Sequence, residues 1–176
     1  MPITTRPAET EYAPFYAGYV ARVPDGDVVD LLRAQLGETL ALLRAVPEER
    51  GGYRYGEGKW SIKEVVGHMA DTERIMCYRA LRVARGDRTP LPGFDEKEYV
   101  KHAGFDRRSL ASLLAEFEQV RIASIAFFET LTPEDQARVG VANDRDVTAR
   151  ALAYIVAGHE RHHVAILRER YLESGD

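Results

Sequence analysis

The sequence contains almost no cysteine, and this absence excludes several kinds of site. Cys77 is the single cysteine among 176 residues. A chain with one cysteine has no internal disulfide framework and cannot build a CxxC metal site. We therefore expect a reducing compartment, the cytoplasm. The stretch 1–11 is polar and carries acidic residues, so a secretory signal is not expected there.

Long apolar runs and runs of positive charge are also missing. No apolar stretch approaches the roughly 20 residues that cross a bilayer, so we expect no membrane partner. The formal net charge is −4, with 24 Lys and Arg interspersed among 28 Asp and Glu. A nucleic-acid partner requires a basic surface that neutralises phosphates, so none is expected. The chain has no internal repeat, and its length suits a single domain over residues 1–176.

Apolar residues recur at helical spacing in four segments, at about 28–46, 61–85, 109–131 and 147–173. Asp27 is a candidate N-cap of the first segment. Ser61 and Glu64 have the spacing of a capping box at the start of the second. Asp146 is a candidate cap of the fourth. Four amphipathic helices without a convincing set of strands predict an all-α four-helix bundle.

A long connection joins the second and third helices, at about 86–108. Structureless connections of this length are uncommon in compact domains and are often functional. Two interpretations are equally favoured: the segment is functional, or it is an irregular packing loop with a short helical turn near Glu96 to Val100. His102 lies in this connection, and we interpret it as a surface residue.

The apolar stripe of the fourth helix continues through His159 and His163. A buried imidazole costs free energy unless it is paired, and side chains at i and i+4 project side by side. A divalent metal satisfies both rings, because neutral imidazole is a good ligand for such ions. His162 could replace His163, but i,i+4 is the usual spacing of two helical ligands. The alternative for any one of these residues is a structural core histidine.

A third ligand has to come from another helix, and His68 is the candidate. It lies in the middle of the second helix, at the border of the apolar stripe. Its side of that helix also carries Glu64 and Asp71, each within roughly 60° of it. The sequence thus predicts one divalent metal bound by His68, His159 and His163.

Residues 159–163 also match the HExxH pattern of zinc proteases. Those enzymes take a further ligand downstream of the motif, and residues 164–176 contain no histidine. Glu160 points roughly 100° away from His159 on a helix. We therefore expect Glu160 to be a solvent-exposed helix charge.

Three stretches of the sequence match a known family: Gly58–Glu73, Thr89–Phe94 and Ala157–His163. On these residues the chain resembles the DinB-like superfamily, which includes the YfiT-type metal-dependent hydrolases. The resemblance implies an up-down four-helix bundle with a three-histidine site at His68, His159 and His163. It also implies nickel or zinc as the metal and a homodimer. Related members include bacillithiol and mycothiol S-transferases and a mycothiol-dependent isomerase.

Two classes of function follow from these residues. In the first, the chain is a metal-dependent hydrolase or low-molecular-weight-thiol S-transferase with a small-molecule substrate and, for transfer, a thiol cofactor. Asp71 or Glu64 could then act as general base or orient His68, and the alternative for both is an ordinary helix charge. Trp60 and Phe94 could line the pocket, although an aromatic residue next to a helix start more often has a packing role. In the second, the chain is a non-catalytic metal-binding or stress-response structural or interaction protein. A fourth protein ligand that closes the metal site would favour the second class.

Overall fold

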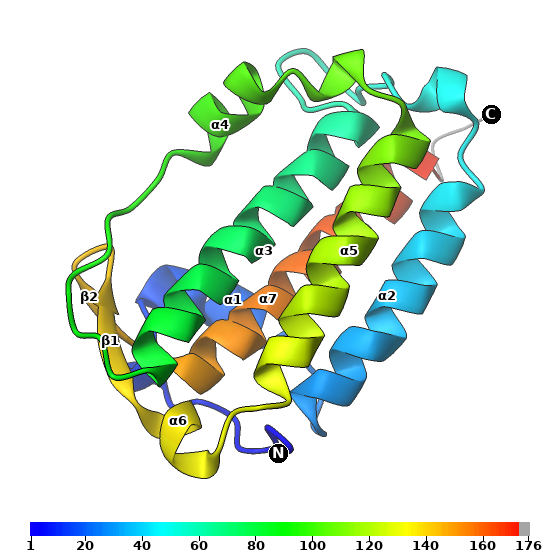
Figure 1. Ribbon diagram of the computed structural model, residues 1–176. Coiled ribbons are helices and arrows are strands. Elements are labelled where there is room, and N and C mark those ends of the chain that lie inside the picture. Colours follow the sequence, from blue (N-terminus) through cyan, green and yellow to red (C-terminus); the bar gives the residue numbers. More distant parts are fainter. Residues whose placement is uncertain (173–176) are drawn as a thin grey trace.

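Four long helices form a bundle in the computed structural model, which describes residues 1–172 (Figure 1). They are α2 (Val28–Arg44), α3 (Ile62–Ala84), α5 (Leu110–Phe128) and α7 (Ala149–Ile166). The predicted all-α four-helix bundle is confirmed. The shorter elements are α1 (Ala17–Val20), α4 (Glu96–Ala103), α6 (Pro133–Ala137), β1 (Val139–Ala142) and β2 (Arg145–Thr148).

The two middle helices of the bundle run in the same direction. In Figure 1, α2 and α7 point one way, and α3 and α5 point the other way. Helix α3 packs between α5 and α7, and α2 packs against the same two helices from the opposite side. The up-down order expected for the bundle is therefore realised as up, down, down, up. The reason is the long connection after α3, which returns the chain to the end where α3 began before α5 starts.

The first two long helices begin at the N-caps that the sequence predicted. The Asp27 carboxylate accepts the Val29 backbone N–H at 3.1 Å. Ser61 and Glu64 form the reciprocal pair of a capping box: the Ser61 hydroxyl accepts the Glu64 N–H, and the Glu64 carboxylate accepts the Ser61 N–H. Such caps satisfy backbone donors that have no partner inside the helix, and each contributes about 1 kcal/mol.

The start of the fourth long helix differs from the prediction. Asp146 and Val147 lie in β2, and the N-cap of α7 is Thr148 instead of Asp146. Strands β1 and β2 form an antiparallel hairpin whose turn residues, Asn143 and Asp144, have φ of 52° and 58°. Two consecutive left-handed residues make the tight turn that suits a hairpin. Strands of four residues are too short to give a recognisable alternation of apolar and polar positions.

The far end of the fourth helix changes its hydrogen bonding. Helix α7 ends at Ile166 and continues as a π-helical segment over Leu167–Leu172. The predicted extension to Glu173 lies outside the described residues. None of the helices in residues 1–172 is long and apolar enough to span a bilayer.

The long connection is an ordered strap along α3. The helical turn expected near Glu96 is α4, and His102 is a surface residue as expected, with 74% of its side chain exposed. Before α4, the strap is fixed to the hairpin: the Leu91 N–H donates to the Val141 carbonyl at 3.0 Å, and the Asn143 N–H donates to the Leu91 carbonyl at 2.9 Å. The strap is therefore held in one place beside the bundle.

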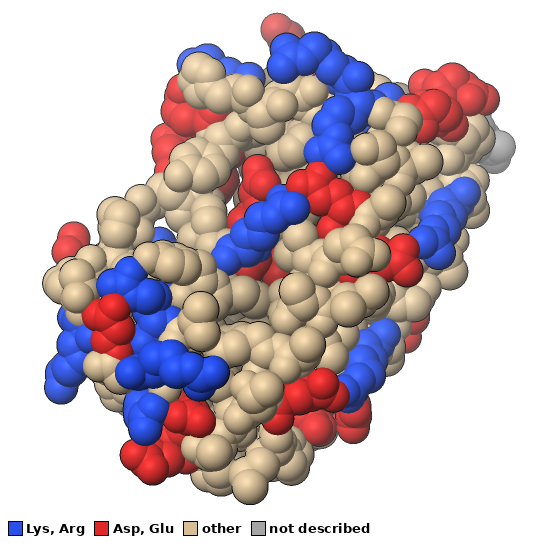
Figure 2. Space-filling model, viewed as in Figure 1, with Lys and Arg blue, Asp and Glu red and all other residues tan. Residues whose placement is uncertain are grey.

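Two apolar clusters fill the interior, one toward each end of the bundle. A layer of buried polar residues lies between them, and it includes five from the middle of α3, α5 and α7: His68, Glu73, Arg121, His159 and Glu160. On the visible face of the molecule, basic and acidic side chains are interspersed (Figure 2). The polar layer, not the surface, is therefore the feature of this fold that needs a functional explanation.

Candidate metal centre

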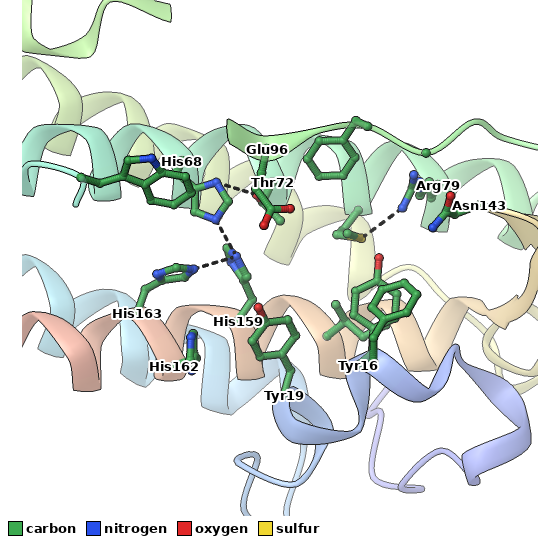
Figure 3. A pocket seen from close by; sticks show the side chains of 16 residues that line it. Tyr16, Tyr19, His68, Thr72, Arg79, Glu96, Asn143, His159, His162 and His163 are labelled. Carbon is green, nitrogen blue, oxygen red and sulfur yellow. Dashed lines mark hydrogen bonds between the residues drawn. The ribbon is translucent and has the colours of Figure 1, made fainter. Parts of the chain in front are cut away.

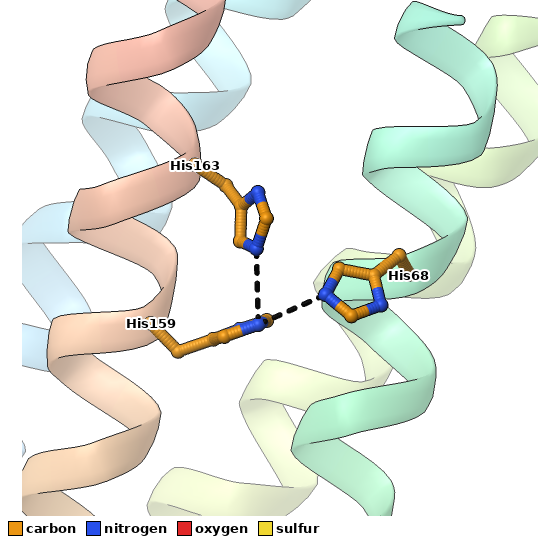
Figure 4. A group of neighbouring side chains, drawn as sticks. All are labelled: His68, His159 and His163. Carbon is orange, nitrogen blue, oxygen red and sulfur yellow. Dashed lines mark hydrogen bonds between the residues drawn. The ribbon is translucent and has the colours of Figure 1, made fainter. Parts of the chain in front are cut away.

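Three histidines converge inside the bundle, and they are the three that the sequence singled out. His68 comes from α3, and His159 and His163 come from the antiparallel α7 (Figure 4). The Nε2 atom of His159 lies 3.0 Å from Nε2 of His68 and 3.1 Å from Nε2 of His163. Helical spacing places the two α7 rings on one face, and the packing of α3 against α7 supplies the third ring.

All three rings are held in the neutral form. Burial, helped by the nearby His162, lowers the pKa of His68 to about 4. Burial likewise lowers the pKa of His163 to about 2 and that of His159 well below its usual range, with further contributions from neighbouring histidines. Neutral imidazole is the form that binds a metal. Nitrogens that share one ion at about 2.0–2.1 Å lie roughly 3 Å apart, so the three Nε2 atoms fit a divalent metal.

Neighbouring aromatic rings fix the orientation of the imidazoles. The Trp60 ring centroid lies 4.7 Å from that of His68, and the Tyr19 ring meets His159 edge-on at 5.4 Å. Gly158 permits the second contact, because a Cβ there would lie 2.0 Å from the Tyr19 carbonyl oxygen. On the far side of His68, Thr72 Oγ1 lies 3.4 Å from Nδ1. If Nδ1 donates this long hydrogen bond, Nε2 is left as the acceptor that faces the other histidines.

A cavity of about 470 Å³ opens beside the three imidazoles (Figure 3). Among the described residues, the group able to hold a metal has three members, and no fourth side chain joins it. The cavity is large enough for a small-molecule ligand. Its wall is formed by α3, α7, the N-terminal segment, the strap and the hairpin turn, through Phe15, Tyr16, Tyr19, Trp60, His68, Thr72, Met76, Arg79, Gly93, Phe94, Glu96, Asn143, Ile155, His159, His162 and His163.

The structure also separates the two histidines that the helical wheel left open. His162 lines the cavity, but its ring packs against Tyr19 at 5.3 Å and it is not part of the convergent group. His163 occupies the position beside His159. The prediction of His163 from its i,i+4 spacing to His159 therefore agrees with the geometry.

The two acids expected beside His68 are not brought to the cluster. Glu64 is engaged at the start of α3 by Ser61 and Arg54, and Asp71 forms an ion pair with Arg74 at 3.3 Å. Neither lines the cavity. On a helical wheel both acids lie on the same side of α3 as His68. The wheel does not show which side chains from other parts of the fold pack against each position.

The cavity also contains polar groups that no sequence motif indicated. Tyr16 and Tyr19 come from the N-terminal segment, Glu96 from α4, Arg79 from α3 and Asn143 from the hairpin turn. None belongs to a motif with metal-ligand spacing. The one available signal was the long strap itself, which suggested a segment that covers the site. Trp60 and Phe94, for which the sequence favoured a packing role over a place in the pocket, both line the cavity.

The expectation for Glu160 was wrong. It is 2% exposed, and its carboxylate accepts hydrogen bonds from Arg121 at 2.7 Å, Gln35 at 2.6 Å and Thr39 at 2.7 Å. Arg121 also makes two hydrogen bonds to the Glu73 carboxylate, at 2.8 and 2.7 Å. The glutamate of the HExxH pattern therefore belongs to a buried network that faces away from the cavity.

Comparisons with known proteins show which family this chain is similar to. The family model of the DinB superfamily matches residues 31–167. A protein of Oceanobacillus iheyensis, named as a candidate metal-dependent hydrolase, is 31% identical over 136 residues, which cover 76% of each chain.

Solved structures show the same fold. YfiT from Bacillus subtilis, described as a candidate metal-dependent hydrolase with an unusual four-helix bundle topology, superimposes with a TM-score of 0.67 at 19% identity, over 94% of this chain and 90% of YfiT. The mycothiol-dependent maleylpyruvate isomerase gives a TM-score of 0.65 at 17% identity, over 78% of this chain and 58% of the isomerase.

Proposed function

This chain belongs to the DinB superfamily, and we propose that it is an enzyme that acts on a small electrophile through one divalent metal ion held by His68, His159 and His163. The observation that carries the proposal is the position of the three imidazoles. Their nitrogens meet in the wall of a cavity, and no fourth side chain among the described residues closes the site. A metal with three protein ligands keeps positions for a reactant.

Bound there, a divalent ion would lower the pKa of a water or thiol and polarise the electrophile. The protein contributes orientation and proton transfer. Trp60 and Tyr19 hold two of the rings in place. Glu96 reaches into the cavity from α4, near Thr72 in Figure 3, and is the carboxylate available to accept the proton of the nucleophile. Burial raises the pKa of the Tyr19 phenol, so this group remains a hydrogen-bond donor at neutral pH.

The nucleophile has to be water or a separate small thiol, because the protein's own thiol is unsuitable. Burial raises the pKa of Cys77 to about 12. Its Sγ lies 3.1 Å from the Ser124 hydroxyl, between α3 and α5, and Cys77 does not line the cavity. Only the thiolate is a good nucleophile. Water is the simpler choice and agrees with the name of the Oceanobacillus relative, whereas a thiol agrees with the name of the isomerase.

The alternative is a metal-binding protein without chemistry. A fully enclosed site would favour this alternative, whereas the cavity beside the histidines favours an enzyme. The position of Glu96 is a second argument, since a structural metal site gains nothing from a carboxylate across an open cavity.

The test is turnover of an activated electrophile, such as chlorodinitrobenzene or an activated ester, by zinc- or nickel-loaded protein with water alone and with a panel of low-molecular-weight thiols. We expect metal-dependent turnover that is lost in His159→Ala and lowered about 10²- to 10⁴-fold in Glu96→Gln, the usual range for a general base. Glu98→Gln, on the same helix outside the cavity, is the matched control. Turnover that is equal in wild type and His159→Ala, or absent with every nucleophile, would favour the non-catalytic alternative.

A further inference from the structure

The end of the cavity away from the histidines contains a buried positive charge without a negative partner. Arg79 of α3 is 3% exposed and lines the cavity. Its guanidinium donates to the Pro92 carbonyl oxygen at 2.7 Å, lies 3.8 Å from the Met76 sulfur and stacks over the Phe94 ring at 5.6 Å, and the Tyr16 phenol lines the same cavity. All of these partners are neutral. No acidic side chain in the part of the chain that the structure describes forms an ion pair with it.

A second hydrogen-bond donor lies at the same end. Figure 3 shows the Asn143 side chain next to Arg79, opposite the histidines. Asn143 is held there by the hairpin turn and by the close approach of Gly93, where a Cβ would lie 2.4 Å from the Asn143 Oδ1 atom. Pro92, which accepts from Arg79, precedes Gly93 in the strap. Arginine, amide and phenol groups thus gather on one part of the wall, and all three can donate to an anion.

The other buried arginine shows what a balanced arrangement looks like. Arg121 has two carboxylate partners, Glu73 and Glu160. A buried charge without a counter-ion is costly, so it is retained where a ligand supplies the opposite charge. A planar guanidinium is well suited to two parallel hydrogen bonds with a carboxylate.

Resting on the proposed function, we propose that Arg79, with Asn143 and Tyr16, binds a carboxylate of the substrate, whose reacting atom lies at the histidine cluster. A carboxylate is favoured over a phosphate because the subsite has one full positive charge and Glu96 lines the same cavity. His68 and Arg79 are about 16 Å apart along α3. The Arg79 side chain reaches back toward Met76, one turn closer to His68. The substrate therefore separates its carboxylate from its reacting atom by on the order of 10 Å.

Binding of matched probes tests this inference without measuring catalysis. Trp60 is the only tryptophan and lines the cavity, so its fluorescence reports occupancy. The first arm compares octanoate with octan-1-ol on metal-free protein. The second compares 8-mercaptooctanoate with 8-mercaptooctanol on zinc-loaded protein. We expect the acid to bind about tenfold to a hundredfold more tightly than the alcohol in both arms, the size of a charged hydrogen bond.

Three variants separate recognition from structure. Arg79→Gln should abolish the preference for the acid, and Arg79→Lys should keep part of it, since the charge remains without the paired donors. Arg82→Gln, which removes a positive charge from the same helix outside the cavity, should leave it unchanged. If Arg79 only anchors the strap through Pro92, Arg79→Gln will weaken acid and alcohol equally, and their ratio will not move.

The two arms also distinguish this inference from the proposed function. No preference for octanoate in wild type overturns the subsite, even where the thiols bind the loaded protein well. A preference for octanoate without any gain from the thiol and zinc supports the subsite and contradicts the proposed role of the metal. Equal ratios in wild type and Arg79→Gln overturn the inference whatever the absolute affinities.

Discussion

Two buried polar clusters lie side by side in the middle of this bundle, and they are built on opposite principles. Successive residues of α7, His159 and Glu160, belong to one each. In the network around Arg121, every charge faces an opposite charge, and the neutral groups donate to the carboxylates. In the histidine cluster, three neutral rings turn their Nε2 atoms toward one another. The first cluster is complete without a ligand, whereas the second is completed by one.

Burial alone does not distinguish the two clusters. His159 and Glu160 are both almost fully buried, so neither exposure nor position in the helix distinguishes structure from function. The distinguishing feature is whether the chain itself supplies the partners. The Arg121 network carries two negative charges and one positive charge, so it also places an excess of negative charge behind the site proposed for a cation.

The largest expected effect is loss of the metal from the incomplete cluster. His68→Ala, His159→Ala and His163→Ala should each reduce the metal content of purified protein from about one ion per chain to near zero, because two imidazoles bind far more weakly than three. Elemental analysis by mass spectrometry measures this. His162→Ala is the matched control and should retain the ion. Full occupancy in all three variants would show that the cluster does not bind the metal.

The next effect concerns the complete network. Arg121→Met should lower the free energy of unfolding by about 3–5 kcal/mol, because it leaves Glu73 and Glu160 buried without their positive partner. Urea unfolding of the metal-free protein measures the change. Arg44→Met removes an exposed ion pair with Glu118 and should cost less than about 1 kcal/mol. A loss as small for Arg121→Met as for the control would mean that the network does not stabilise the fold.

A pH titration distinguishes the two clusters, because burial holds the histidine rings of one uncharged, whereas the other contains the ion pairs of Arg121. In metal-free protein, the lowered pKa of His68 means that the unfolded chain takes up protons below about pH 6.5 while the folded chain does so only near pH 4. The stability is therefore complete above this window and falls as the pH drops through it, by on the order of 3 kcal/mol for His68 alone.

Chemical unfolding at a series of pH values, with and without His68→Asn, follows this loss. The variant should show a shallower decline between pH 6.5 and 4. His102→Asn, on the surface of α4, is the control and should match the wild type. A decline that is identical in all three proteins would place its origin outside the cluster.

The smallest effects are expected for the two acids that the sequence placed beside His68. Asp71→Asn and Glu64→Gln should each change metal content and turnover by less than about threefold, because their carboxylates are occupied by arginines outside the cavity. Glu64→Gln also preserves the capping box. A loss of turnover by either variant comparable to that of Glu96→Gln would restore the original assignment of a base on α3.

The four long helices and the three imidazoles could be predicted from the sequence, because they depend on interactions between residues that are close in the chain. Asp27 and the Ser61–Glu64 pair start their helices through hydrogen bonds within three residues. His159 and His163 share a face because they are one turn apart. His68 required a further step, from its position at the edge of the apolar stripe and from the resemblance to the DinB-like superfamily.

The partners of the remaining polar residues depend on how distant segments of the chain pack together. The positively charged partner of Glu160 is Arg121, 39 residues earlier, and no helical angle identifies it. The parallel course of α3 and α5 follows from the strap, and the cavity arises where the strap, the N-terminal segment and the hairpin turn meet the bundle. Glu96 and Arg79 line the cavity because these segments pack together. Local sequence patterns record neighbours along the chain, whereas the wall of a cavity is assembled from distant segments.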